Sequence, residues 1–289
     1  MAENMFPIFD AHMHHSLVQL DEVVASYQEC GVIGGINLWW GGIYRADFGD
    51  YLRGLRKRNL RNIVPFYWPD WSQFPQDPSR FVSRLCGDMH RYGALGARGL
   101  KVWKDLGMYL RHRDGSPATM DDPRLEPVWG TCEELDWVTA VHQADPSHNF
   151  KSTTGLTREE LFKRRDRVIA AHPHVTFLLC HAGNDVEDVG RFGKLLDTFP
   201  NVISEVGRAL ERHDSTREVR TFLKRYADRL YIGADLGFRE DRPVDRRWNL
   251  EGCYLPLRKR MTEIWGLTGE ALERIAWRNG QNCFLTGPA

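Results

Sequence analysis

Two histidines stand two positions apart near the start of the chain. His12 and His14 lie at the end of the short apolar run Met5–Met13. If this run is a β-strand, residues two apart project to the same side, so both imidazoles point together at its carboxyl end. Imidazole nitrogens suit Zn²⁺, or Fe and Mn at higher coordination. The pair therefore predicts part of a metal site.

Further polar residues end later apolar runs in the same way. His142, His181 and Asp235 each end or directly follow such a run. Strand alternation groups His181 with Leu179 on one face and Asp235 with Gly233 on one face. The chain has 11 histidines, and any one of them alone is more simply a surface or core residue. Four histidines and one aspartate at strand ends exceed chance placement and favour metal binding.

The elements that position these residues are eight short apolar runs with helical segments between them. The runs are Met5–Met13, Val32–Trp40, Asn62–Trp68, Ala97–Trp103, Trp137–His142, Val175–His181, Asn201–Val206 and Leu230–Ala234. Runs of this kind are typical of parallel strands buried on both faces. Eight of them alternating with helices predict a (β/α)₈ TIM barrel, with the polar residues gathered at the carboxyl-terminal face of the strands.

An open doubly wound sheet is the competing fold. It would be favoured by a glycine-rich phosphate loop after the first strand, and that strand ends instead in Asp-Ala-His-Met-His-His. No sharp change of composition and no Ser/Gly linker divides the chain, so we expect residues 1–289 to form a single domain.

Composition excludes several classes of function. Lys plus Arg and Asp plus Glu both number 39, which argues against a nucleic-acid binder or a polybasic membrane anchor. No run approaches 18 apolar residues, and residues 1–10 lack the pattern of a secretion signal. The six cysteines are widely spaced and form no CxxC pair, so we expect a cytoplasmic protein with reduced thiols. We expect a small-molecule substrate as partner, and barrels of this kind often form homodimers.

The ordered set of motifs resembles the amidohydrolase superfamily. The similarity is to its amidohydrolase-related branch, which combines metal-dependent hydrolases with decarboxylases of the aminocarboxymuconate-semialdehyde decarboxylase type. The segments that carry the resemblance are Asp10–His14, Gly99–Lys101, His142–Pro146, His181–Gly183, Gly233–Asp235 and the closing stretch Ala276–Phe284. One departure is Gly-Ala-Asp at the eighth strand, where the family usually has Gly-Thr-Asp. The resemblance implies a distorted (β/α)₈ barrel with one or two divalent metals, Zn first and Mn or Fe as alternatives.

The resemblance also implies roles for the site residues. His12, His14, Asp235 and either His142 or His181 would hold one metal and leave a position for water. Bound Zn²⁺ lowers the pKa of that water to about 7 and makes it a nucleophile. Asp235 would accept its proton and pass it to the leaving group, and His181 is the second expected catalytic residue.

Lys101, at the end of the fourth predicted strand, decides the expected metal count. In two-metal family members a lysine at this place is carboxylated and bridges the ions, so Lys101 is a candidate ligand. The alternative is that Lys101 binds a substrate carboxylate in a one-metal site. Lys104 is expected to contact substrate or to support the ligands.

Two further groups are candidates for binding substrate. Arg208 follows the seventh run and matches a carboxylate through its planar fork, although an ion pair with Glu205 or Asp185 explains it equally well. Trp39 and Trp40 end the second run, where they would wall an apolar or aromatic pocket.

The leading functional prediction is a metal-dependent hydrolase of a small amide, lactone or ester. The alternative is a metal-dependent, non-oxidative decarboxylase of a small carboxylic acid, with an aromatic acid as one option, on the same residues. An Fe or Mn enzyme that uses oxygen is less favoured, as is a non-catalytic binding barrel, which should have lost some of the ligands.

Overall fold

The computed structural model describes residues 5–40, 44, 46–207, 210, 216–237 and 250–286. Its strands form one parallel sheet in the order β8-β7-β6-β5-β4-β3-β2-β1-β9. The strands are β1 (Ile8–His14), β2 (Val32–Leu38), β3 (Ile63–Tyr67), β4 (Gly99–Val102), β5 (Val138–Val141), β6 (Phe177–Leu179), β7 (Val202–Glu205), β8 (Leu230–Tyr231) and β9 (Leu236–Gly237). Each of the eight predicted runs contains a strand, and the fold is the predicted α/β barrel.

The eighth strand differs from the prediction because it is divided into two segments. β8 pairs with β7, whereas β9, beyond the predicted end at Ala234, pairs with β1. Asp235 separates the segments with a left-handed backbone, at φ 50°, which an extended strand cannot contain. The N–H of Ala11 donates to the carbonyl of Ile232 at 2.8 Å, so the last strand closes the barrel against the first.

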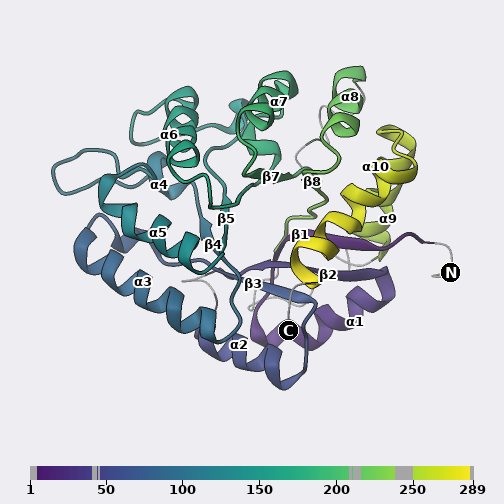
Figure 1. Ribbon diagram of the computed structural model, residues 1–289, viewed down its shortest axis with the longest axis horizontal. Helices are drawn as coiled ribbons and strands as arrows, with labels where there is room; N and C mark the ends of the chain where they lie inside the picture. Colours follow the sequence, from purple (N-terminus) through teal and green to yellow (C-terminus); the bar gives the residue numbers. More distant parts are fainter. Residues whose placement is uncertain are drawn as a thin grey trace.

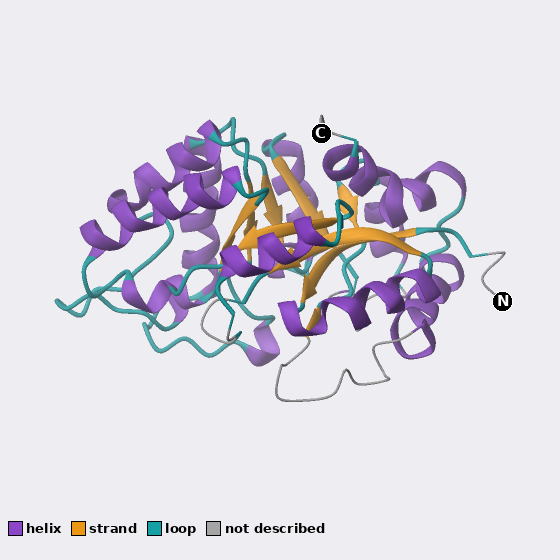
Figure 2. Cartoon of the chain, turned by 90° about the horizontal axis from the view of Figure 1, so that it is seen from below, coloured by secondary structure: helices purple, strands orange, loops and turns teal. Residues whose placement is uncertain are grey.

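Helices cover the outside of the sheet (Figures 1 and 2). They are α1 (Leu20–Cys30), α2 (Phe48–Lys57), α3 (Pro78–Ala94), α4 (Asp105–Met108), α5 (Glu126–Glu134), α6 (Arg158–Ala171), α7 (Val189–Thr198), α8 (Arg217–Arg225), α9 (Leu255–Lys259) and α10 (Gly269–Glu273). π-Helical turns at Arg260–Ile264 and Arg274–Arg278 extend the last two. The predicted capping box at Thr157 and Glu160 is formed at the start of α6. Within the described residues, none of the helices is long and apolar enough to cross a membrane.

A β-bulge in β1 sets the direction of the histidine pair. Phe9 and Ala11 point into the barrel, where they join an interior apolar cluster, whereas Met13 packs outward against Tyr27. Asp10 and Met13 pair with residues only two apart on β2, so β1 holds one extra residue between them. The extra residue reverses which positions face inward. His12 and His14 therefore point toward the barrel axis directly after Ala11.

Candidate metal centre

Three side-chain atoms meet at the carboxyl ends of β1 and the divided eighth strand. His12 Nε2 lies 3.2 Å from His14 Nε2 and 3.4 Å from Asp235 Oδ1. His14 Nε2 lies 3.5 Å from the same carboxylate oxygen. We call these three atoms the ligand triangle. Both imidazoles are buried, whereas the Asp235 side chain is 38% exposed, so solvent reaches the triangle from the Asp235 side.

The second nitrogen of each imidazole fixes its tautomer. His14 Nδ1 lies 2.8 Å from the carbonyl oxygen of Leu38, and His12 Nδ1 lies 2.9 Å from Glu205 Oε1. A carbonyl and an ionised carboxylate can only accept, so both Nδ1 atoms carry the proton. The two Nε2 atoms then face each other with lone pairs, an arrangement that repels unless a cation lies between them.

The triangle fits a divalent metal ion. A point about 2 Å from all three atoms exists just off their plane, and Zn–N and Zn–O bonds have this length. Burial lowers the pKa of His12 to about 4, an effect that the carboxylates of Asp235 and Glu205 only partly offset, so its imidazole is neutral at pH 7, as a metal ligand must be. Burial alone would raise the pKa of Asp235, but the three imidazoles around it hold that pKa well below its ordinary value.

Glu205, at the end of β7, contacts two histidines. Its Oε1 lies 2.9 Å from the Nδ1 of His12 and 2.9 Å from the Nδ1 of His181, and it accepts the backbone N–H of His181 at 2.6 Å. Burial would raise the pKa of Glu205, but the two imidazoles outweigh it and lower that pKa. The sequence pattern suggested Glu205 only as an ion-pair partner of Arg208 and did not predict this role. One signal in the sequence could have indicated this role: Glu205 is an acidic residue at the end of a strand, as the histidines are.

His181 reaches the site through a left-handed backbone. Leu179 packs between sheet and helices while Cys180 lies inside the barrel, so plain alternation would turn His181 outward, contrary to the face that the sequence pattern suggested. Its φ of 57° and ψ of 50° redirect the ring, whose Nε2 comes within 4.0 Å of Asp235 Oδ2. Burial would lower the pKa of His181, but Glu205 and Asp235 outweigh it and raise that pKa. His12, His181 and Asp235 together form a cluster able to hold an ion.

His142 lies on the far side of His181. The two rings meet edge to face with centroids 4.8 Å apart. Its Nε2 is buried without a hydrogen-bond partner, and the nearest carboxylate oxygen, in Asp145, is 3.6 Å away. Both oxygens of Asp145 accept from Lys104 Nζ at 2.7 Å. The structure thus brings His142 next to the centre but outside the triangle. Lys104 forms an ion pair with Asp145.

Lys101 points into the barrel interior beneath the triangle. It is 1% exposed, and its Nζ lies 2.9 Å from Cys180 Sγ. Burial raises the pKa of the Cys180 thiol to about 11, although Lys101 acts in the opposite direction, so this thiol is neutral at pH 7. The contact pairs Lys101 with a neutral thiol instead of a ligand of the triangle.

Three tryptophans form a wall beside His14. Trp40 and Trp68 stack with centroids 5.4 Å apart, and Trp103 packs on Trp68 at 5.1 Å. The His14 ring lies 5.7 Å from Trp40 and 5.9 Å from Trp68. We call these three residues the tryptophan wall.

Two predicted substrate residues are placed differently or not described. Trp39 is turned the other way and packs against Tyr44, Phe48 and Tyr51, so Trp40 stands at the site in its place. Arg208 lies outside the described residues.

Comparison with known families identifies the class of protein. The amidohydrolase family model matches residues 71–279, which is most of the chain, and the chain belongs to this family of metal-dependent enzymes. No curated protein matches the chain.

Solved structures share the fold at low sequence identity. An uncharacterised TIM-barrel protein from Bordetella bronchiseptica has a TM-score of 0.64 and 13% identity, covering 96% of this chain and 98% of that one. A 2,6-dihydroxybenzoate decarboxylase bound to 2,6-dihydroxybenzoate has a TM-score of 0.62 and 15% identity, covering 97% and 100%. A 5-carboxyvanillate decarboxylase from Novosphingobium aromaticivorans, complexed with manganese and a nitrobenzoic acid, has a TM-score of 0.58 and 11% identity, covering 99% and 97%. At these identities the similarity establishes only the barrel fold. The reaction has to be inferred from the residues of the site.

Proposed function

We propose that the protein is a metal-dependent, non-oxidative decarboxylase of a small planar carboxylic acid. The observation that carries the proposal is that the ligand triangle opens directly beside the tryptophan wall, through the contacts of His14 with Trp40 and Trp68. Indole faces bind flat conjugated rings by stacking. A planar acid seated on the wall therefore presents its carboxyl group to the triangle.

The protein's own residues have separate tasks in this proposal. His12, His14 and Asp235 would hold one divalent ion, Zn²⁺ first and Mn²⁺ or Fe²⁺ next. Such an ion supplies positive charge that stabilises negative charge developing on substrate oxygens. His181 is the proposed proton donor: burial would lower its pKa, but Glu205 and Asp235 outweigh this and raise it. The carbon–carbon bond breaks, CO₂ leaves, and the ring carbon that keeps the electron pair takes the proton from His181.

We infer a one-metal site from the contact that Lys101 makes. Its Nζ donates to the buried Cys180 Sγ at 2.9 Å, and this neutral thiol is not one of the three ligands. We therefore favour an unmodified Lys101 over a carboxylated one that bridges two ions. Metal analysis of the purified protein should give about one ion per chain, and the intact mass should show no added CO₂. Two ions with a carboxylated Lys101 would return the proposal to hydrolysis.

The reaction is tested by supplying the metal-loaded protein with a panel of hydroxybenzoic acids and measuring released CO₂. We expect release that stops on chelation and returns with added metal. The variant His181→Asn should retain bound metal while losing turnover, whereas His12→Ala/His14→Ala should lose both. A protein that releases no CO₂ from any of these acids but opens lactones or amides in a metal-dependent way would be a hydrolase.

Hydrolysis remains the second candidate because of Asp235. Its carboxylate stays ionised through the surrounding imidazoles and is 38% exposed, so it can accept a proton from an attacking water. A parallel panel of small lactones, amides and esters distinguishes the two reactions on the same protein sample.

A further inference from the structure

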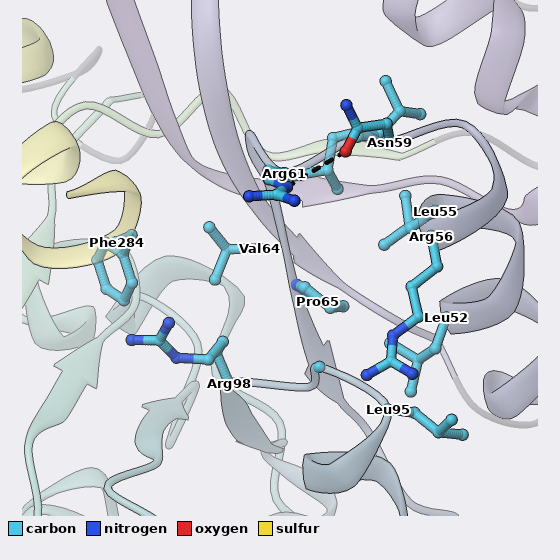
Figure 3. Close-up of a pocket in the computed structure, with 13 residues that line it drawn as sticks. Leu52, Leu55, Arg56, Asn59, Arg61, Val64, Pro65, Leu95, Arg98 and Phe284 are labelled. Atoms are coloured by element: carbon cyan, nitrogen blue, oxygen red, sulfur yellow. Dashed lines mark hydrogen bonds between the residues drawn. The ribbon is translucent and has the colours of Figure 1, made fainter. Parts of the chain in front are cut away.

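A cavity lies at the first residues of β3, at the opposite end of the barrel from the ligand triangle. Figure 3 shows the residues that line this cavity. The cavity has a volume of about 420 Å³ and is lined by the first residues of β3, the end of α2 and the α3–β4 connection. Trp68 of the tryptophan wall follows the other end of β3, so the two sites are separated by the length of that strand. The volume lies within the range of small-molecule sites, about 300–1,000 Å³.

The inner surface of this cavity is apolar. Val64 and Phe284, 3% and 7% exposed, belong to the interior cluster of the barrel, and the Phe284 ring stacks on Phe9, whereas Leu52 lies on the other side of β3 (Figure 3). The other apolar lining residues are Leu55, Leu60, Ile63, Pro65 and Leu95. These side chains are fixed by the core behind them, so the cavity is preformed. A ligand that covers its apolar surface would be stabilised by removing that surface from water.

Three arginines stand at the rim of the cavity, and no acidic residue lines it. Arg56 donates to the carbonyl of Ala94 at 2.7 Å, and Arg61 Nε donates to Asn59 Oδ1 at 3.2 Å. Among the described residues, none of the three is paired with a carboxylate. Arg61 and Arg98 extend on the Phe284 side of the cavity, and Arg56 lies toward Leu95 (Figure 3). In a chain with 39 basic and 39 acidic residues, this is a local excess of positive charge.

We propose that the cavity binds a small organic oxyanion with an apolar group, either a phosphate monoester or a carboxylate. Guanidinium groups bind both kinds of oxyanion through paired N–H donors. Arg61 and Arg98 hold the oxyanion, and the aryl or short alkyl group of the ligand covers Val64 and Phe284. The proposal is independent of the reaction at the metal centre, because none of the lining residues belongs to that site.

The test is a calorimetric titration of the metal-loaded protein with phenyl phosphate and, separately, with benzoate. At least one of these probes should bind with one equivalent that the variant His12→Ala/His14→Ala retains, which separates it from binding at the metal centre, and the probe preferred in that variant identifies the oxyanion. The variant Arg61→Ala/Arg98→Ala should weaken this binding at least tenfold. A matched control, Arg80→Ala/Arg217→Ala, removes two exposed arginines elsewhere and should bind as the unchanged protein does. All four arginines are exposed, and thermal unfolding checks that both variants fold.

Two further titrations test the location of the site and the role of its apolar surface. The variant His12→Ala/His14→Ala should keep the binding; loss in this variant, with retention in Arg61→Ala/Arg98→Ala, would overturn the proposal by assigning the anion to the metal centre. Inorganic phosphate should bind at least tenfold more weakly than phenyl phosphate, because it leaves the apolar surface uncovered. Equal binding of the two would show that the apolar surface plays no part, and no binding of either organic probe would reject the site.

Discussion

At the scale of single residues, Glu205 is the group whose removal should reveal how the centre is held. It accepts from the Nδ1 atoms of His12 and His181 at 2.9 Å each. Partners of this kind orient the imidazole and raise its basicity. We expect Glu205→Gln to weaken metal affinity by about 10–100-fold, measured by competition with a chelator of known affinity.

The matched control for that variant is Glu134→Gln, which changes an exposed glutamate on α5 that lies 3.7 Å from His90. It should leave metal affinity unchanged. Equal affinities in Glu205→Gln and the unchanged protein would mean that the carboxylate of Glu205 does not support the ligands.

At the scale of elements, the closure of the barrel depends on two glycines. A Cβ built on Gly207 would lie 1.6 Å from the carbonyl oxygen of Gly233, and one on Gly233 would lie 2.8 Å from Glu205 Oε2. Because backbone cannot yield as a flexible side chain can, Gly207→Ala should lower the free energy of unfolding by at least about 1–3 kcal/mol. Chemical denaturation measures this directly.

The opposite result is expected for a glycine within a helix. Gly130 lies in α5, and a Cβ there would meet nothing within 4 Å. Gly130→Ala should therefore raise the free energy of unfolding by about 0.5–1 kcal/mol through the better helix propensity of alanine. A stabilising Gly207→Ala would contradict the close approach of β7 and the eighth strand.

A second prediction at this scale concerns Glu187, which joins two connections and a helix. Its Oε1 accepts from the backbone and hydroxyl of Ser147, and its Oε2 accepts from Arg158 at the start of α6. Burial would raise the pKa of Glu187, but these donors outweigh it and lower that pKa from 4.5 to about 2. A lowered pKa means that the contribution is complete above about pH 4.5 and is lost as pH falls toward 2.

Unfolding measured at a series of pH values tests this directly. The difference in unfolding free energy between the unchanged protein and Glu187→Gln should be constant above about pH 5 and shrink toward pH 2. Glu133→Gln, on the exposed face of α5, serves as control and should show no such pH-dependent difference. A difference for Glu187→Gln that is independent of pH would reject the ionised carboxylate of Glu187 as its cause.

The sequence predicted the order of strands and the residue types at their ends, because buried parallel strands leave continuous apolar runs and barrel sites lie at strand termini. It could not predict the bulge in β1 or the left-handed turns at His181 and Asp235, since backbone dihedrals of this kind leave no periodic signal. Trp39 instead follows the regular alternation of β2, in which Ile36 and Leu38 face the barrel interior and Trp39 faces outward. Local geometry, more than residue identity, decides which side chains of a correctly predicted strand reach the site.

At the scale of the whole molecule, the ligand triangle joins the two ends of the chain's path around the barrel. Asp10, next to the histidine pair, accepts the backbone N–H of Ala234, 224 residues away. Tyr254 donates to the second oxygen of Asp10 at 2.8 Å, so the segment that leads to α9 is tied to the same point. The first and last strands therefore meet where His12, His14 and Asp235 converge.

Metal removal should for this reason lower the stability of the whole barrel. An ion that binds the folded chain and not the unfolded one adds about 2.7 kcal/mol at a hundredfold excess over its Kd, which for a chain of this size corresponds to roughly 4–5 °C in Tm. Scanning calorimetry with and without chelator should show one transition that shifts downward as a unit, because the ligands come from both ends of the sheet. In His12→Ala/His14→Ala the chelator should leave Tm unchanged, since the remaining carboxylate cannot hold the ion alone. A chelator effect that persists in this variant would place the stabilising ion elsewhere in the molecule.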